Sequence, residues 1–242
     1  MTATAIRPPA GRVPPPPGRL RRHPRLVCAA LLLIAVLAGV AYTLLGTQLA
    51  AVRTVQVTGT REVPASAVLA AARVPVGTPM VRLDGAVIGA RILARLASVG
   101  SVSVHRSWPS TVRLAVRERV VAVVVPHDGQ FLLVDRTGVG YRLTEAAPAG
   151  AVTASLADPG PADESTRAAL AVLAGLPRDL RALVQRIAAP TPDQVTLLLK
   201  DHRAVLWGGR EDGRAKAAVV HILLHRKGQH IDVSAPHLVT VR

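Results

Sequence analysis

The most constraining feature of this 242-residue sequence is an apolar run close to its N-terminus. Residues Leu26 to Leu45 contain no charged side chain over 20 positions, about the length that an α-helix needs to cross the hydrocarbon core of a bilayer. Six arginines and no carboxylate precede the run, and the first acidic residue, Glu62, follows it. By the positive-inside rule, this asymmetry predicts one membrane-spanning helix over residues 26–45 with the N-terminus in the cytoplasm.

A cleaved secretory signal is the alternative interpretation of the apolar run. Such a signal has an apolar region of about 7 to 15 residues, followed by a small-x-small cleavage site. The run here is longer, and residues 48–51 (QLAA) make a poor cleavage site. We therefore expect an uncleaved anchor, with residues 46–242 outside the cytoplasm.

The segments on either side of the anchor are both basic. Residues 1–25 combine the six arginines with several prolines and few core-forming side chains, which predicts a disordered, Pro-rich cytoplasmic tail. Without these arginines, the formal charge of +15 falls to +9 for the rest of the chain. This excess favours an acidic neighbour such as anionic lipid headgroups, cell-wall polyanions or an acidic protein, and with this topology nucleic acid is not an expected partner.

Residues 50–119 alternate between strand and helix patterns. The expected order is strand, helix, helix, strand, strand, over residues 52–59, 64–72, 86–96, 99–106 and 112–119. A turn at Ser107–Ser110 joins the last two strands. The pattern predicts a small β-α-α-β-β domain.

Residues 120–242 predict a mainly β domain with flanking helices. Expected strands cover residues 120–125, 130–134, 139–143, 195–200, 204–207, 231–233 and 238–241, and expected helices cover 163–173, 178–185 and 216–227. The Ala-, Pro- and Gly-rich stretch from Ala146 to Pro161 is expected to be an exposed loop. The whole chain is therefore assigned to the α+β class.

Seven short motifs, in order and at the right spacing, resemble one known family. They are Val52–Gly59, Val104–Val112 with its Trp-Pro turn, Val116–Arg119, Leu133–Gly138, Leu206–Gly209, Lys216 and Ile231–Pro236. The chain is similar to the bacterial cell division family FtsQ, called DivIB in some lineages, whose first extracytoplasmic domain is a POTRA domain. One departure is that Val120 and Val121 stand where family members often have a proline after the Glu-Arg pair.

The resemblance implies a non-enzymatic scaffold of the divisome. Such a protein would sit in the cell (inner or plasma) membrane at the division septum as a single-pass protein. It would recruit FtsB-like and FtsL-like bitopic division proteins and help to control septal peptidoglycan synthesis, without a cofactor or small-molecule substrate. Two alternatives remain open: a POTRA-containing translocation or assembly component, and a membrane-anchored hydrolase.

Family members bind FtsB chiefly through the end of the chain, and the residues here suit that role. Leu238, Val239, Thr240 and Val241 are β-prone and free of proline, which is typical of an edge strand with unpaired N–H and C=O groups. A partner segment would add to such an edge through main-chain hydrogen bonds. The partner-binding residues expected from this interpretation are Ser234, His237, Leu238, Val239, Thr240, Val241 and Arg242. The alternative is that this strand lies inside the sheet.

The remaining motif residues are interpreted as structural: Arg106, Trp108, Pro109, Glu118, Asp135, Gly138 and Lys216. Trp108 and Pro109 predict a rigid hairpin whose indole caps the domain core. Glu118 is expected to form an exposed ion pair with a neighbouring arginine, and Asp135 with Gly138 to form a turn. Lys216 is expected to be a solvated lysine near the start of a helix.

An enzyme is not expected, because no catalytic constellation is present. The sequence has no Gly-x-Ser-x-Gly elbow, no phosphate-binding Gly-rich loop and no His-Glu-x-x-His motif. The single cysteine, Cys28, excludes a disulfide framework and a cysteine-based zinc site. His221 and His225 share a helix face, but without a carboxylate between them we expect no metal site.

Overall fold

The computed structural model describes residues 24–46, 50–225, 228–235 and 240–241. It begins with α1 (Pro24–Gly46), which covers the whole predicted anchor. Among the described residues, no helix combines the length and the hydropathy that a bilayer crossing requires. The membrane span therefore stays a prediction.

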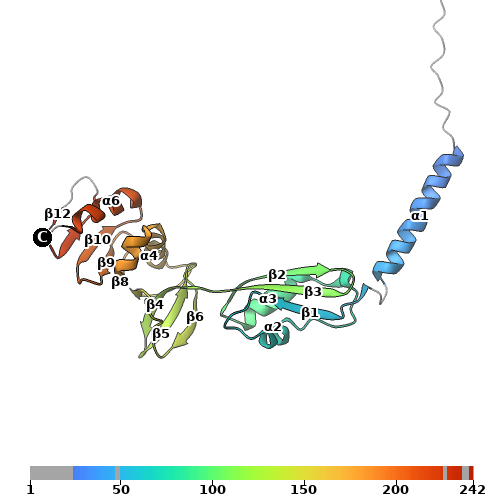
Figure 1. The fold of residues 1–242 in the computed structure, drawn as a ribbon, viewed down its shortest axis with the longest axis horizontal. Coiled ribbons are helices and arrows are strands. Elements are labelled where there is room, and N and C mark those ends of the chain that lie inside the picture. The colour runs from blue at the N-terminus through green and yellow to red at the C-terminus, as the bar shows by residue number, and fades with distance from the viewer. Residues whose placement is uncertain (1–23, 47–49, 226–227, 236–239, 242) are drawn as a thin grey trace, which may run out of the picture.

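After α1 the chain forms two separate sheets, which follow one another in space as they do in sequence (Figure 1). We call residues 50–119 the three-stranded domain and residues 120–241 the nine-stranded domain. The elements of the three-stranded domain are β1 (Thr54–Thr58), α2 (Ala65–Ala72), the short 3-10 helix η2 (Met80–Arg82), α3 (Gly85–Arg95), β2 (Val99–Ser107) and β3 (Thr111–Glu118). This is the strand and helix order that the sequence predicts.

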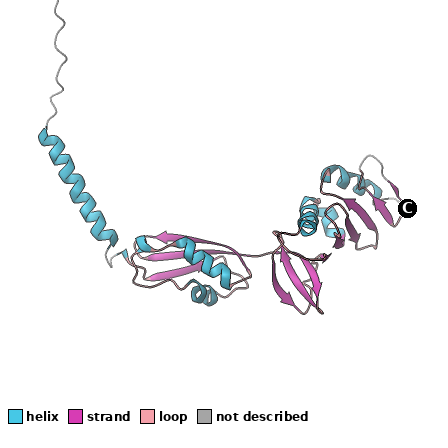
Figure 2. Ribbon diagram, turned by 180° about the vertical axis from the view of Figure 1, so that it is seen from behind, coloured by secondary structure: helices cyan, strands magenta, loops and turns pink. Residues whose placement is uncertain are grey.

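Strand β3 is central in the three-stranded domain, parallel to β1 and antiparallel to β2. Helices α2 and α3 cover one face of this sheet (Figure 2). Because side chains alternate along a strand, β3 buries Val112, Leu114 and Val116 beneath the helices and leaves Arg113 and Arg117 on the open face. The core is thus one-sided, and the open face is polar.

The nine-stranded domain contains more strands than the sequence predicts. Its elements are β4 (Val121–His127), β5 (Gln130–Asp135), β6 (Gly140–Thr144), β7 (Thr153–Ser155), α4 (Glu164–Gly175), α5 (Arg178–Leu183), β8 (Val184–Ala188), β9 (Val195–Leu199), β10 (Ala204–Gly208), α6 (Gly213–Leu223), β11 (His230–Asp232) and β12 (Thr240–Val241). The sheet order is β12-β11-β10-β9-β8-β7-β4-β5-β6. The two outer strands of this described sheet are therefore β6 and β12.

For this domain, one prediction is wrong and a second is correct except for its last two residues. The expected loop over Ala146–Pro161 contains β7, whose Ala154 is fully buried, because this short strand joins β4 to β8 in the middle of the sheet. The expected helix over residues 178–185 ends at Leu183, and β8 begins at Val184. Neither strand is self-evident from local pattern, since each is held by parallel pairing with a distant partner.

Helices α4 and α6 place the apolar core of the nine-stranded domain on one side of its sheet. The predicted helix over residues 163–173 is confirmed as α4, and Asp163 caps it, with Oδ2 accepting from the Thr166 N–H at 2.6 Å. Leu173 of α4, Val220 of α6 and Trp207 of β10 are all buried in one cluster. The two strands predicted on either side of Asp201–Arg203 are confirmed as β9 and β10, which pair antiparallel.

Candidate functional site

The last two strands form one end of the nine-stranded sheet. Strand β11 lies parallel to β10, and β12 lies antiparallel to β11 with Thr240 opposite Asp232 and Val241 opposite Ile231. Among the described residues, β12 pairs on one side only, so its other backbone edge faces away from the sheet. This is the terminal edge strand that the sequence favours over an interior strand.

The residues before β12 hold this edge firmly to the core. Ile231 and Val233 are 1% and 0% exposed, and the Val233 N–H donates to the Leu206 carbonyl oxygen at 3.0 Å. Ser234 is exposed, but its N–H and hydroxyl donate to Asp232 Oδ1 at 2.9 and 2.7 Å. Ser234 therefore forms the turn that leaves β11. Of the other expected partner-binding residues, His237, Leu238, Val239 and Arg242 lie outside the described residues.

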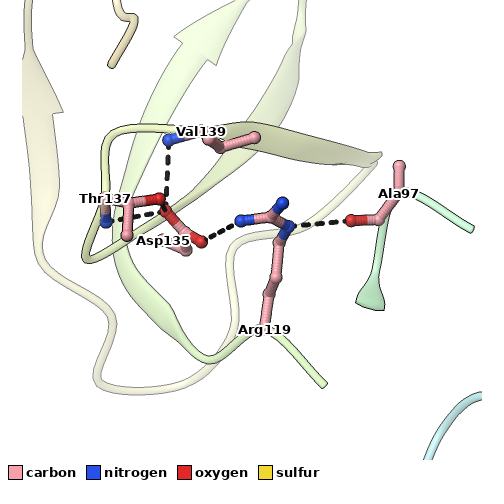
Figure 3. A network of polar contacts seen from close by, with 5 residues as sticks. All are labelled: Ala97, Arg119, Asp135, Thr137 and Val139. Carbon is pink, nitrogen blue, oxygen red and sulfur yellow. Dashed lines mark hydrogen bonds and ion pairs between the residues drawn. The ribbon is translucent and has the colours of Figure 1, made fainter. Parts of the chain in front are cut away.

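A second concentration of polar groups joins the two domains. Arg119, directly after β3, donates from its backbone N–H to the Ser98 carbonyl oxygen at 2.8 Å and from Nε to the Ala97 carbonyl oxygen at 3.0 Å. Its Nη1 forms an ion pair with Asp135 Oδ2 in the nine-stranded domain (Figure 3). One guanidinium thus holds both domains at once, and we call this contact the domain joint.

Asp135 is the centre of the joint on the nine-stranded side. Its Oδ1 accepts from the N–H and the hydroxyl of Thr137, at 2.8 and 2.6 Å, and from the Val139 N–H at 3.1 Å (Figure 3). Burial by itself raises the pKa of this carboxyl, but the Thr137 hydroxyl, the Arg119 guanidinium and the two backbone donors outweigh it. The pKa of Asp135 is therefore lowered, and the carboxylate stays ionised in the joint.

The predicted turn at Asp135 and Gly138 is confirmed, and it packs more tightly than the sequence indicates. Gly138 has a φ of +86°, and a Cβ there would lie 3.0 Å from Pro161 Cα. Glycine meets both requirements because it tolerates positive φ and has no Cβ. An ion pair 2.7 Å long between Arg142 Nη1 and Glu62 Oε2 adds an exposed second contact between the domains.

The expected ion pair of Glu118 with an arginine is wrong. Its carboxylate accepts the backbone N–H groups of residues 61–63, at distances from Oε1 of 2.7 Å for Arg61 and 2.9 Å for Val63. Burial alone raises the pKa of Glu118, but these N–H donors hold it below its usual value. Glu118 thus orders the loop that leads into α2, because that loop has N–H groups without helix partners.

Lys216 is also not solvated as expected. It is 2% exposed, and its Nζ donates to the Gly209 carbonyl oxygen at 3.0 Å. The ammonium therefore ties the start of α6 to the chain after β10. The buried indole of Trp207 lies close to Gly213, the first residue of the same helix. The helix dipole makes the start of α6 an unfavourable position for a cation, for which the sequence suggests a compensating carboxylate. The partner is instead a backbone carbonyl oxygen, which only the fold supplies.

The Trp-Pro turn differs from its prediction as well. Trp108 and Pro109 do form the turn between β2 and β3, but the indole is 50% exposed and so does not cap the core. Arg106, on the strand just before, donates from Nη2 to the Leu83 carbonyl oxygen. The role of Arg106 is structural here, whereas the exposed indole has no packing role in the described core.

No metal site is found among the described residues, where no three His, Cys, Asp or Glu side chains group closely enough to hold an ion. His221 Nδ1 instead lies 3.5 Å from Asp179 Oδ2, and His225 Nδ1 lies 3.1 Å from the His221 carbonyl oxygen. A cleft of about 560 Å³ lies beside the joint, lined by residues that include Glu62, Arg117 and Tyr141. Its lining is charged but offers no nucleophile with an adjacent base.

Sequence reasoning missed the joint, although both partners lie in motifs that it singled out. Arg119 ends the Val116–Arg119 motif, and Asp135 begins a turn with Thr137 two positions later. The usable signal was the Asp-x-Thr spacing, which allows a carboxylate to bind the N–H and hydroxyl two residues on. The pairing with Arg119 carried no local signal, because the two residues belong to different sheets.

Comparisons with known proteins match both domains. Residues 50–119 match the family model described as POTRA domain, FtsQ-type, and residues 122–234 match Cell division protein FtsQ/DivIB, C-terminal. The chain is 39% identical over 196 residues to Cell division protein FtsQ of Mycolicibacterium smegmatis, covering 81% of this chain and 58% of that protein. It is 36% identical over 238 residues to Cell division protein FtsQ of Streptomyces collinus, covering 92% and 90%.

One solved structure also resembles the chain. The major extracytoplasmic domain of the trans isomer of the cell division protein DivIB from Geobacillus stearothermophilus matches with a TM-score of 0.34 and 19% identity. The match covers 46% of this chain and 98% of that one.

Proposed function

The chain belongs to the FtsQ/DivIB family of bacterial cell division proteins, and from this premise we propose that it is a non-enzymatic scaffold which captures a bitopic division protein at the septum. Its division role follows from the family. The proposed partner is the extracytoplasmic segment of an FtsB-like protein, itself paired with an FtsL-like protein. In this role the chain would help to control septal peptidoglycan synthesis by placing its partners rather than by catalysis.

The observation that carries this proposal is the position of β12 at the end of the nine-stranded sheet. An edge strand presents N–H and C=O groups to which an extended segment adds by main-chain hydrogen bonds. Because side chains alternate along a strand, alternate side chains of the added segment contact opposite faces of the sheet. The buried Ile231 and Val233 support this use, since they hold the neighbouring strand rigid while the partner binds.

The proposed location is the cell membrane, with the N-terminus in the cytoplasm and both domains outside. Its support is the uncharged stretch of residues 26–45 within α1 and the six arginines that precede it. In this arrangement the three-stranded domain lies next to the membrane and β12 lies at the far end of the chain. The domain joint then sets the direction in which the edge strand is presented.

A binding experiment tests the scaffold function. Full-length protein in detergent is titrated with the extracytoplasmic part of the organism's FtsB-like protein, beside a Val239→Pro variant and a chain that ends at Ala235. If the expected strand over residues 238–241 forms the edge, proline at position 239 removes one main-chain donor from it, so both changes are expected to abolish capture. Val239→Ala is the matched control, because it shortens the same side chain but keeps the N–H donor.

The outcomes separate the scaffold from its proposed site. Binding by the unaltered chain that survives both Val239→Pro and the truncation would move the partner site away from β12. An absence of binding by the unaltered chain, with a circular dichroism spectrum typical of a folded α+β protein, would contradict the proposed partner. Circular dichroism of each variant checks that lost capture does not come from unfolding.

A further inference from the structure

The end of the three-stranded domain that faces α1 is built from several segments that are distant in sequence. We call residues 51–53, 76–82 and 106–110 the α1-side tip. Val52 exchanges hydrogen bonds with Gly77 and Thr78 at 2.8 and 2.9 Å. The Arg53 N–H donates to the Ser110 carbonyl oxygen at 2.8 Å. These bonds place the loop before η2 and the Trp-Pro turn on either side of residues 51–53.

Three large apolar side chains are exposed on this tip. Val76 is 71% exposed, Val81 is 54% exposed and Trp108 is 50% exposed. Each lies within two residues of a position that bonds to residues 51–53. Single exposed apolar residues are ordinary, but three from two segments at one end of a small domain form a surface that water solvates poorly.

The charges around these side chains are positive. Arg53 and Arg82 are exposed on the same tip, and neither has an ion-pair partner among the described residues. The nearest acidic residue in sequence, Asp84, uses Oδ1 to accept from the Ala86 and Val87 N–H groups at the start of α3. Across residues 50–119 there are ten arginines and three carboxylates. An anionic surface therefore complements the tip.

The tether to α1 is too short to let this tip move far away. Four residue steps separate Gly46, the last residue of α1, from Ala50, so they span at most about 14 Å when extended. Ala50, Ala51 and Val52 are buried in the domain, and α1 lies next to η2. If α1 crosses a bilayer, the short linker keeps the α1-side tip close to the membrane surface from which α1 emerges.

We propose that the α1-side tip rests on the outer surface of the membrane, as a lipid-binding contact of the three-stranded domain. Trp108, Val76 and Val81 enter the interfacial layer, and Arg53 and Arg82 bind lipid phosphates. Tryptophan is enriched at this depth because its ring is apolar and its N–H is polar, and an anionic surface attracts each nearby arginine. The inference rests on the membrane anchoring of the proposed function.

A bilayer contact has a structural consequence for the whole molecule. A domain tethered only by a short linker tilts freely about it, whereas a domain with apolar contacts on two loops does not. The joint at Arg119 transmits this orientation to the nine-stranded domain. The tip would therefore decide at which angle β12 is presented above the membrane. A protein partner for the tip is the competing occupant, and the test separates the two.

The experiment uses the two tryptophans of the full-length chain as reporters in vesicles. Trp207 is 1% exposed in the nine-stranded core, so lipids carrying brominated acyl chains are expected to quench Trp108 alone. The expected result is a loss of emission on brominated lipid in the unaltered protein, absent from Trp108→Phe. The loss is expected to grow when anionic phospholipid is added and to shrink at high salt.

A pair of charge variants tests the orientation of the contact. Arg82→Glu on the tip is expected to reduce quenching on anionic vesicles. Arg117→Glu, an identical change at an exposed position of the same domain, is expected to leave it unchanged, because Arg117 lies seven residues from the tip along β3, about 23 Å away. Equal losses in both variants would overturn the tip as the contact in favour of diffuse attraction.

Vesicle flotation distinguishes a failure of membrane anchoring from a failure of the tip contact. Protein that fails to float with vesicles lacks the anchor, which contradicts the proposed membrane location. Protein that floats but shows the same emission on brominated and ordinary lipid is anchored without tip contact, which overturns the inference alone. In that case the exposed tip surface would be left for a protein partner.

Discussion

The two domains differ in where they put their charge and where they leave their backbone unpaired. The three-stranded domain has ten arginines against three carboxylates, whereas residues 120–242 have 14 basic and 12 acidic side chains. The nine-stranded sheet instead ends in the short strand β12, whose outer edge has no described partner. The difference indicates a division of labour: the domain next to α1 suits an anionic surface, and the distal domain suits another polypeptide.

The two domains also depend on different kinds of contact for stability. Each has its own apolar cluster on one side of its sheet. The contacts between them are polar: the Arg119–Asp135 pair and the exposed Arg142–Glu62 pair. We therefore expect substitutions in either core to act on one domain, and substitutions at the joint to act on their relative orientation.

The largest expected effect comes from the buried tryptophan. Trp207→Ala removes a large side chain that is 1% exposed, so we expect the nine-stranded domain to lose about 3–5 kcal/mol of unfolding free energy. Hydrogen exchange should show that amide protection is lost in the nine-stranded domain and unchanged in the three-stranded domain. Trp108→Ala is the matched control, and because its indole is half exposed we expect a much smaller change. Similar losses in both variants would contradict the difference in burial, and lost protection in both domains of Trp207→Ala would mean that the two domains unfold as one unit.

The next largest loss of stability is expected from substitution of a glycine in the three-stranded domain. Gly59 has a φ of +85°, and a Cβ there would lie 2.1 Å from the Val116 carbonyl oxygen. Gly59→Ala is therefore expected to cost about 2 kcal/mol or more in chemical denaturation, with the loss confined to the three-stranded domain. Gly77→Ala has nearly the same φ, +87°, with no atom within 4 Å, and so measures the backbone strain alone. A smaller cost for Gly59→Ala than for Gly77→Ala would contradict the close approach of β3.

Breaking the joint should loosen the domains relative to each other. Arg119→Ala leaves the buried Asp135 carboxylate without its cation, which is expected to cost about 1–3 kcal/mol. The distribution of distances between spin labels on the two domains should become broader. Arg142→Ala removes the exposed pair and is expected to cost less than about 1 kcal/mol, without broadening. Equal broadening in both variants would show that the joint is not centred on Arg119.

The smallest effect is a pH dependence of the joint. The pKa of Asp135 is lowered in the folded protein, whereas in the unfolded chain it has its usual value of about 3.9. The carboxylate therefore stabilises the folded state above this pH, and the contribution is lost as the pH falls through the folded pKa. Asp135→Asn should flatten the acid side of a stability-against-pH curve. Glu145→Gln, at an exposed position, serves as the control, and an unchanged slope in Asp135→Asn would contradict the assignment.

The predictions from sequence succeeded where structure is decided locally. The elements of the three-stranded domain came out in the right order because each is short, strongly patterned and separated by a turn signal. The start of α4 was also correct, since an acidic residue before an Ala- and Leu-rich stretch caps the helix without tertiary help. The strands β9 and β10 are joined by a tight turn, so their pairing was predictable as well.

The predictions that were wrong concern structure that is decided by contacts between distant segments. Strand β7 has only three residues and exists because β4 and β8 flank it. Lys216 is buried because the chain after β10 brings the Gly209 carbonyl oxygen to it, and Trp108 lies in a turn outside the buried cluster of its domain. In each case a local pattern was compatible with two environments, and long-range packing selected one.

By itself, the sequence determined the family, the α+β class, the uncharged stretch of residues 26–45 and the uneven distribution of charge. These are properties of composition and short-range pattern, so no fold is needed to recognise them. Only the tertiary structure decided that Arg119 joins two sheets, that β12 ends one of them, and that Val76, Val81 and Trp108 share one tip. Such juxtapositions depend on backbone pairing between distant segments. The periodicity of side chains along the chain does not specify which distant segments pair.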